Sequence, residues 1–340
     1  MALLCFAAVC GRAADGLDVA RSALADKLYG VAERQALLVL TTPGPPDARS
    51  DALLVYLQAL AEQGQHAEVL KVLDSHKATV DAGPAASFAY WRALARLATG
   101  DAAGARAAAE AGLAAQPGDA DAHALRRVAA QARLTLGDGP GALALYAELD
   151  AAVADPALRA ALLLEWARAL DGMGRAADAT AVLARQPRDL PADPHVEQGT
   201  LLQARLLARL DRRDEAEQVL RAMAADARSD ESGRVQALVQ LARLQFEGGR
   251  VNDAVSSARA ADAAARMPDL RLIAGFRLGE ILLSATNTLE EGETRMKSLV
   301  REFPEAPEAR EAQLLLADAL FAAGRYERAA DAYQIYIESF

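Results

Sequence analysis

The residue types that most often carry out chemistry are few in this sequence, and their spacing does not suit it. Both cysteines, Cys5 and Cys10, lie near the start of the chain, so the rest of it can form neither a disulfide nor a cysteine-based metal site. The histidines are scattered and never stand at metal-ligand spacing: His66, His76, His123 and His195. With no visible acid/base pair, nucleophile or metal cluster, the sequence predicts a protein that is not an enzyme and has no cofactor or metal.

Two short segments superficially resemble binding motifs. The segment GDGPG, residues 137–141, has the glycine content of a phosphate-binding loop, but no predicted strand precedes it, so we interpret it as a turn between helices. The segment DADAH, residues 119–123, brings two carboxylates close to His123. Carboxylates favour the first turn of a helix because of the helix dipole, so we interpret this segment as a helix start and not as a metal site.

Composition and charge narrow the class of protein. The chain has 340 residues, enough for about two average domains, and 52% of them are hydrophobic but only 5% aromatic. Because alanine, the best helix former, dominates and β-branched residues are scarce, this balance favours closely packed helices over sheets. The formal net charge of −10 argues against nucleic acid as a partner, since a phosphate-binding surface needs an excess of basic residues.

The first residues, MALLCFAAVCGRAADG, resemble the second half of a secretory signal. An apolar run, residues 2–9, is followed by small residues suited to cleavage, although no positively charged region comes first. We interpret residues 1–14 as a partial signal peptide, which predicts a periplasmic or cell-envelope protein; if the stretch is an ordinary apolar helix end, the protein is cytoplasmic. A lipid anchor on Cys10 is a further alternative. No later stretch is as long and apolar as a membrane span.

A small residue recurs along the chain at a nearly constant interval. Successive positions differ by 36 to 38 residues, a regularity that the abundance of alanine alone does not explain. The recurring positions, called the anchors below, are Ala32, Val69, Ala105, Ala142, Ala179, Ala216, Ala254, Gly292 and Ala329. The sequence therefore predicts an array of about nine units over residues 15–340.

Other features keep the same interval. Five residues before each anchor stands a residue suited to a turn: Lys27, Gly64, Gly100, Gly137, Gly174, Asp211, Gly249, Asn287 or Gly324. Twelve residues before each anchor stands alanine, except for Leu57 and Glu280. Twelve residues after three anchors stands a proline, where a helix must end: Pro117, Pro191 and Pro304.

We interpret each unit as two antiparallel helices joined by the turn. Apolar residues recur at helical spacing, as in LLLADALF (314–321), and the small residues allow the two helices to approach closely. One such pair cannot bury its own apolar face, so neighbouring pairs must stack on it. The predicted fold class is all-α, an α-solenoid of stacked antiparallel helix pairs.

The last unit carries the clearest motif. Ala317, Gly324, Tyr326 and Ala329 match, in order and spacing, the small residue, turn glycine, aromatic residue and alanine of the tetratricopeptide repeat (TPR). The chain resembles this family, in its bacterial exported type, although its period is near 37 residues and not about 34. The resemblance implies a right-handed superhelix. In the eighth unit Glu280 and Gly292 stand where the family has alanine, which puts tight packing there in doubt.

The resemblance also implies where partners bind, since in this family the first helix of each unit lines a concave groove. Two groove positions are rich in arginine and give five candidate partner-binding residues: Arg127, Arg168, Arg205, Arg243 and Arg277. A row of guanidinium groups can bind carboxylates in bidentate fashion, so the hypothesis is a basic strip that binds an acidic peptide or a free carboxyl terminus. The alternative is that these arginines pair with Glu165, Asp171 or Glu247 and only keep the surface soluble.

Together these features predict a non-enzymatic interaction scaffold of the periplasm or cell envelope that binds partner proteins or peptides in its groove. Phe340 stands where Phe303 stands one unit earlier, and no polar-backed helix follows it, so we expect the array to continue beyond this chain. The alternative is the N-terminal recognition array of a longer protein whose enzyme or signalling domain lies beyond residue 340.

Overall fold

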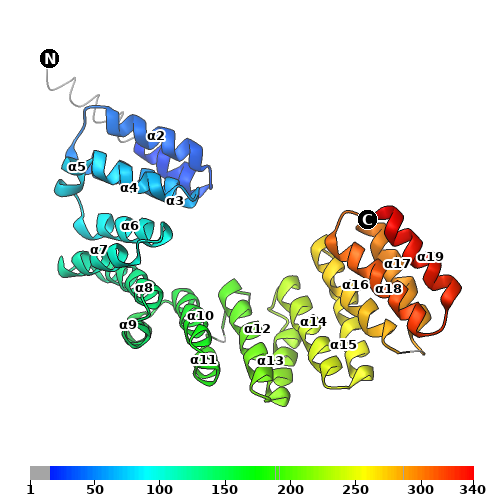
Figure 1. Ribbon diagram of the computed structural model, residues 1–340. Helices are drawn as coiled ribbons and strands as arrows, with labels where there is room; N and C mark the ends of the chain where they lie inside the picture. Colours follow the sequence, from blue (N-terminus) through cyan, green and yellow to red (C-terminus); the bar gives the residue numbers. More distant parts are fainter. Residues whose placement is uncertain (1–15, 188, 191, 286) are drawn as a thin grey trace. The chain divides into compact units, whose positions relative to one another are not determined.

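The computed structural model describes residues 16–187, 189–190, 192–285 and 287–340, and every regular element in that part of the chain is a helix. The chain forms two compact units, Met1–Val153 and Ala154–Phe340. Within each unit, helices that follow one another in the chain lie side by side (Figure 1). The predicted all-α solenoid of helix pairs is confirmed. The predicted signal peptide, residues 1–14, lies outside the described residues.

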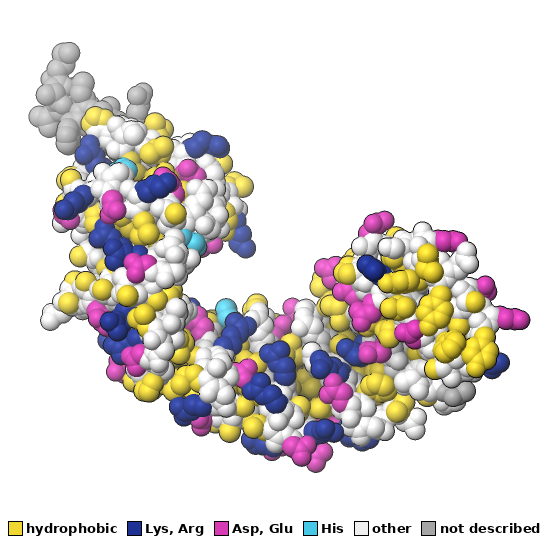
Figure 2. All heavy atoms as spheres, in the orientation of Figure 1, with side chains coloured by type: hydrophobic (Ala, Val, Ile, Leu, Met, Phe, Trp, Pro, Cys, Tyr) yellow, Lys and Arg dark blue, Asp and Glu magenta, His cyan; other side chains and the backbone are white. Residues whose placement is uncertain are grey.

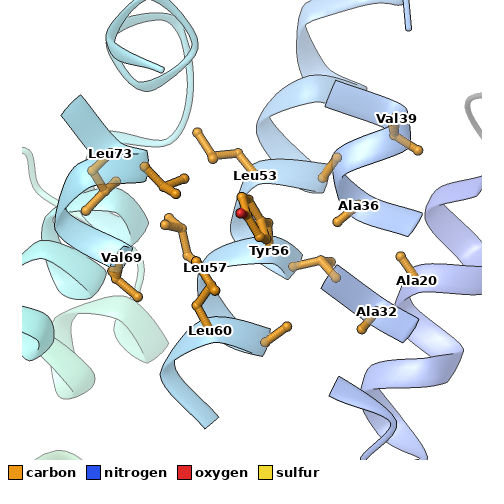
Figure 3. Packing of buried hydrophobic residues seen from close by; sticks show 14 of the residues in the cluster. Ala20, Ala32, Ala36, Val39, Leu53, Tyr56, Leu57, Leu60, Val69 and Leu73 are labelled. Carbon is orange, nitrogen blue, oxygen red and sulfur yellow. The ribbon is translucent and has the colours of Figure 1, made fainter. Parts of the chain in front are cut away.

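The first unit begins with a helix over residues 16–25. It continues with α2 (Tyr29–Thr41), α3 (Pro46–Glu62), α4 (His66–Ser75), α5 (Lys77–Ala82), α6 (Ala85–Ala98), α7 (Ala102–Ala114), α8 (Asp119–Thr135) and α9 (Gly139–Ala152). Figure 3 shows its core, where Ala20 and Ala32 lie side by side at the contact of the first two helices. Alanines at this contact bring the helix backbones close, as the repeat predicts.

The second unit contains α10 (Pro156–Gly172), α11 (Ala176–Leu183), α12 (Pro194–Arg209), α13 (Arg213–Ala225), α14 (Glu231–Glu247), α15 (Val251–Ala264), α16 (Pro268–Leu283), α17 (Leu289–Glu302), α18 (Pro307–Ala322) and α19 (Tyr326–Ser339). Proline is the first residue of α10, α12, α16 and α18, a position where its missing N–H costs nothing. The last pair leaves large apolar side chains on its surface, and Tyr326 is 64% exposed with its ring against Phe321. Apolar side chains accordingly gather over α18 and α19 in Figure 2.

The short helix α5 does not follow from the repeat. It exists because the second helix of its pair, α4, ends early at Ser75. The Ser75 hydroxyl donates to the Val72 carbonyl oxygen at 3.0 Å, and a hydroxyl bond of this kind competes with continuation of a helix. The chain then restarts as α5, which packs on α3 and α6.

The predicted turns share one backbone conformation. All but one of the turn positions have a positive φ, between 59° and 88°: Lys27, Gly64, Gly100, Gly137, Gly174, Asp211, Gly249 and Gly324. The residue that follows each turn position donates its backbone N–H to the carbonyl oxygen five residues earlier in the chain, at 2.8 to 2.9 Å; after Gly249, for example, Arg250 donates to Gln245. This is the Schellman closure of a helix end, in which a left-handed residue satisfies carbonyls that the helix leaves free.

Exchanging residue types at these turns should change stability in opposite directions. We expect Gly249→Ala to lower the free energy of unfolding by about 1 kcal/mol, because a side chain at positive φ is crowded by its own backbone. Asp211→Gly should raise it by about 0.5 kcal/mol, since Asp211 now holds a φ of 60°. Urea unfolding of both variants measures this, and shifts of the same sign would contradict the turn geometry.

The anchors lie in the core as predicted. Ala105, Ala142, Ala179, Ala216 and Ala254 are fully buried, and Ala329 is 1% exposed. The alanines that stand twelve residues earlier are buried as well: Ala20, Ala93, Ala130, Ala167, Ala204, Ala242 and Ala317. The small residues therefore mark where the two helices of each pair touch.

The doubt about tight packing in the eighth unit was wrong. A Cβ added to Gly292 would lie 2.9 Å from the backbone nitrogen of Leu283, so α17 touches the backbone of α16. Gly279, and not Glu280, is the buried small residue of α16, and a Cβ there would lie 2.7 Å from Met296 Sδ. The contact residue of α16 thus stands one position before the place that the repeat predicts. Glycines replace alanines at this contact because α16 and α17 leave no room for a Cβ.

Candidate functional site

The predicted groove arginines occupy the first helices of their pairs. Arg168 on α10, Arg205 on α12 and Arg243 on α14 are exposed, and they belong to consecutive pairs of the second unit. Figure 2 shows Lys and Arg side chains gathered over α12 and α14 on the face in view. Arg277 on α16 is half-buried, and Arg127 on α8 belongs to the first unit.

A pocket of about 290 Å³ lies among α12, α13 and α14 and brings two of these arginines together. Its charged and amide side chains, called the arginine pocket below, are Arg205, Arg209, Arg213, Gln240, Arg243 and Glu247. Leu220 and Leu244 supply part of its apolar wall. Four arginines against one glutamate give the lining a formal charge of +3 in a protein whose net charge is −10.

Three of the four arginines already have carboxylate partners. Arg243 Nε donates to Glu247 Oε1 at 2.7 Å, as the alternative interpretation predicted. Arg209 pairs with Asp171, and Arg213 Nε lies 3.8 Å from Asp211 Oδ1. Ion pairs near the surface contribute little to stability.

Arg205 differs from its neighbours in the pocket. It has no ion pair or hydrogen bond with any residue that the structure describes. A guanidinium has five N–H donors in a planar fork, which matches the two oxygens of a carboxylate. An incoming carboxylate can therefore bind Arg205 without first displacing an internal one.

The other candidate arginines are differently engaged. Arg168 does not line the pocket, and its Nη2 donates to the amide oxygen Oε1 of Gln198 at 2.8 Å. Arg277 pairs with Glu280 on its own helix. The structure thus brings Arg205 and Arg243 into one pocket and places Arg168 on the neighbouring helix.

Sequence reasoning missed Arg209, Arg213 and Gln240 as pocket residues. Arg209 follows Arg205 by four residues and so lies on the same face of α12, which is a signal that the sequence contains. Arg213 begins α13, and its place in the pocket depends on how the turn at Asp211 aims that helix. Nothing in the repeat pattern distinguishes it from the other residues that follow a turn.

The two segments that resembled binding motifs have structural roles. In GDGPG, Gly137 closes α8, and Asp138 caps α9 by accepting from the Gly141 N–H at 3.0 Å. In DADAH, Asp119 and Asp121 lie in the first turn of α8. Within residues 16–187, 189–190, 192–285 and 287–340, no three metal-ligating side chains lie close enough together to hold a metal ion. Over the same residues, no helix has the length and hydropathy of a membrane span.

No protein-family model matches the sequence, and no curated protein matches it. Solved structures do match its fold. The apo form of RapI superimposes with a TM-score of 0.58 at 11% identity, over 96% of this chain and 97% of that one. The C-terminal part of a TPR repeat-containing protein from Cytophaga hutchinsonii gives a TM-score of 0.52 at 12% identity, over 82% of this chain and 98% of that one. These likenesses show that the chain has a TPR-like helical-repeat fold.

Proposed function

We propose that this protein is a non-enzymatic scaffold that binds acidic segments of partner proteins at the arginine pocket. The observation that carries the proposal is Arg205, an exposed guanidinium among three other arginines with no partner among the described residues. Leu220 and Leu244, which are largely buried, form the apolar floor of the pocket beside it. Arginine clusters of this kind recognise carboxylates by charge-assisted, bidentate hydrogen bonds.

The test is binding of a fluorescein-labelled octapeptide of alternating Glu and Leu, followed by fluorescence anisotropy at low salt. Arg205→Gln should weaken binding about tenfold, the loss of one charge-assisted pair. Arg259→Gln is the matched control, because Arg259 is an exposed arginine on α15 that pairs with Glu291 at 2.6 Å. Equal binding by the native protein and Arg205→Gln would contradict the proposal, as would equal losses in both variants.

We further propose that the protein is exported to the periplasm or cell envelope. The support is the apolar run over residues 2–9, followed by small residues suited to signal cleavage. Mass spectrometry of terminal peptides from the native protein should find a mature start near Ala14. A start at Met1 would contradict export and favour a cytoplasmic protein.

A further inference from the structure

A second cavity, of about 470 Å³, lies among α11, α12 and α13 in the same unit. Thr200 and Gln203 of α12 line it, whereas Arg205 and Arg209 of α12 line the arginine pocket. Residues of a helix are about 100° apart, so Thr200 and Arg205 point about 140° away from each other. The cavity therefore opens on a different face of α12 from the arginine pocket.

The cavity exists because α11 is short. It has 8 residues, whereas the second helices of the next pairs, α13, α15 and α17, have 13, 14 and 14. The missing turns leave the α13 side chains Val219 and Met223, which are otherwise packed in the core, lining the cavity. Gln186, just after α11, donates from its Nε2 to the His195 carbonyl oxygen on α12 at 3.1 Å. Gly199 makes room for this, since a Cβ there would lie 2.1 Å from Gln186 Nε2.

The cavity combines an apolar wall with a carboxyl group. Leu183, Val196, Val219 and Met223 form the wall. Glu197, in the first turn of α12, also lines it, and its Oε1 is buried with no hydrogen-bond partner among the described residues. Glu197 Oε1 faces the start of α14, because a Cβ on Gly233 would lie 2.4 Å from it, so a ligand in the cavity would meet the rest of the carboxyl group.

The ends of helices α12, α13 and α14 each have an aspartate near Glu197. Asp193 precedes α12, and Asp230 precedes α14 and accepts from the Gly233 N–H at 2.7 Å. Asp226, at the end of α13, lies on the rim. The cation in the lining, Arg228, is bound by that aspartate through its Nη2 at 2.9 Å. Burial, the charge of Asp230, a side-chain hydrogen bond with Asp230 and the charge of Asp193 raise the pKa of Glu197 to about 7. A positive charge in the cavity would offset this repulsion among the carboxylates.

We propose that the α11–α13 cavity binds an arginine or lysine side chain of a partner protein, with its aliphatic stem on the apolar wall and its cationic head at Glu197. Long cationic side chains have this two-part character, an apolar stem and a charged tip. The occupant is basic because the lining has two carboxyl groups against one guanidinium, which is already paired with Asp226, and because Asp193 and Asp230 lie close to Glu197. This charge balance is the reverse of that in the arginine pocket. The two sites would thus recognise segments of opposite charge on different faces of one helix.

Met223 allows a local test by NMR of protein labelled with ¹³C at the methionine methyl groups. The probes are the capped tetrapeptide Leu-Arg-Leu-Leu and the same peptide with norleucine in place of arginine. The arginine peptide should shift the Met223 methyl signal and leave Met173 and Met267, which are exposed elsewhere in the unit, unchanged. The norleucine peptide should bind at least tenfold more weakly.

Two variants separate this site from the arginine pocket. Glu197→Gln keeps the shape of the side chain and should weaken the arginine peptide about tenfold, while Arg205→Gln should leave it unchanged. Equal binding of the two peptides would reduce the site to an apolar cavity and overturn the proposal. Absence of a Met223 shift at millimolar peptide, or undiminished binding by Glu197→Gln, would overturn it as well.

Discussion

Gly292→Val is expected to lower the free energy of unfolding of the second unit by about 3 kcal/mol. The new Cβ would lie 2.9 Å from Leu283 N and 3.1 Å from the Leu282 carbonyl carbon, both of them backbone atoms that cannot rotate away. The helices α16 and α17 would have to separate, and overpacking of this kind typically costs about 1–3 kcal/mol, with the branched side chain at the upper end. Because each pair of a repeat array contacts only its neighbours, the loss should be concentrated there.

Amide hydrogen exchange followed by mass spectrometry measures both the size and the place of the effect. Faster exchange is expected in α16 and α17, with α10 and α11 little changed. Gly172→Ala is the control: no side-chain or distant atom lies within 4 Å of its added Cβ, and alanine is the better helix former. If Gly292→Val left exchange and melting as in the native protein, the close contact of α16 and α17 would be refuted.

Glu197→Gln should raise the free energy of unfolding by about 1–2 kcal/mol at pH 8 and change it little at pH 5. Burial and the carboxylates Asp230 and Asp193 raise the pKa of Glu197 from 4.5 to about 7 in the folded protein. Between these values the folded state holds a proton that the unfolded state releases, so stability falls as pH rises through this window. The full shift corresponds to about 3 kcal/mol, and partial solvent exposure of the side chain reduces it.

The measurement is urea unfolding of the native protein and Glu197→Gln from pH 4.5 to 8.5. Their difference should grow from pH 4.5 to 7 and then level off. His195 Nδ1 lies 3.2 Å from Asp193, so the series is repeated in a His195→Gln background to remove the contribution of the histidine. Glu215→Gln is the control, because hydrogen bonds from Arg212 lower the pKa of that exposed carboxyl. A constant difference between pH 4.5 and 8.5 would contradict the buried carboxyl.

The sequence predicted those parts of the fold that depend on contacts close along the chain. A positive φ favours glycine, or a residue such as asparagine or aspartate that adopts it at low cost. Gly174 and Gly249 therefore predicted the positions of their turns from sequence alone. Close helix contact needs small residues, so Ala216 and Ala254 revealed the core. In the eighth pair the same rule failed by one position: Gly279, not Glu280, is the contact residue, because the turn that follows α16 differs from the others.

The candidate sites were predicted only in part, because they depend on where helices end. Arg205 and Arg243 were predicted from their place in the repeat, and they share a pocket. Arg213 joins them only through the direction that α13 takes after its turn. The α11–α13 cavity could not be predicted, since the spacing of Ala179 and Ala216 is regular and does not show that α11 ends at Leu183.

The most direct test of the proposed function is site-specific photo-crosslinking of the labelled Glu/Leu octapeptide. The photoreactive residue p-benzoylphenylalanine replaces Gln240, an exposed side chain of the arginine pocket, or Gln218, an exposed side chain on α13 outside that pocket. We predict crosslinking at position 240, suppressed by high salt and by Arg205→Gln, and none at position 218. Equal crosslinking at both positions, or crosslinking at neither, would contradict the arginine pocket as the binding site.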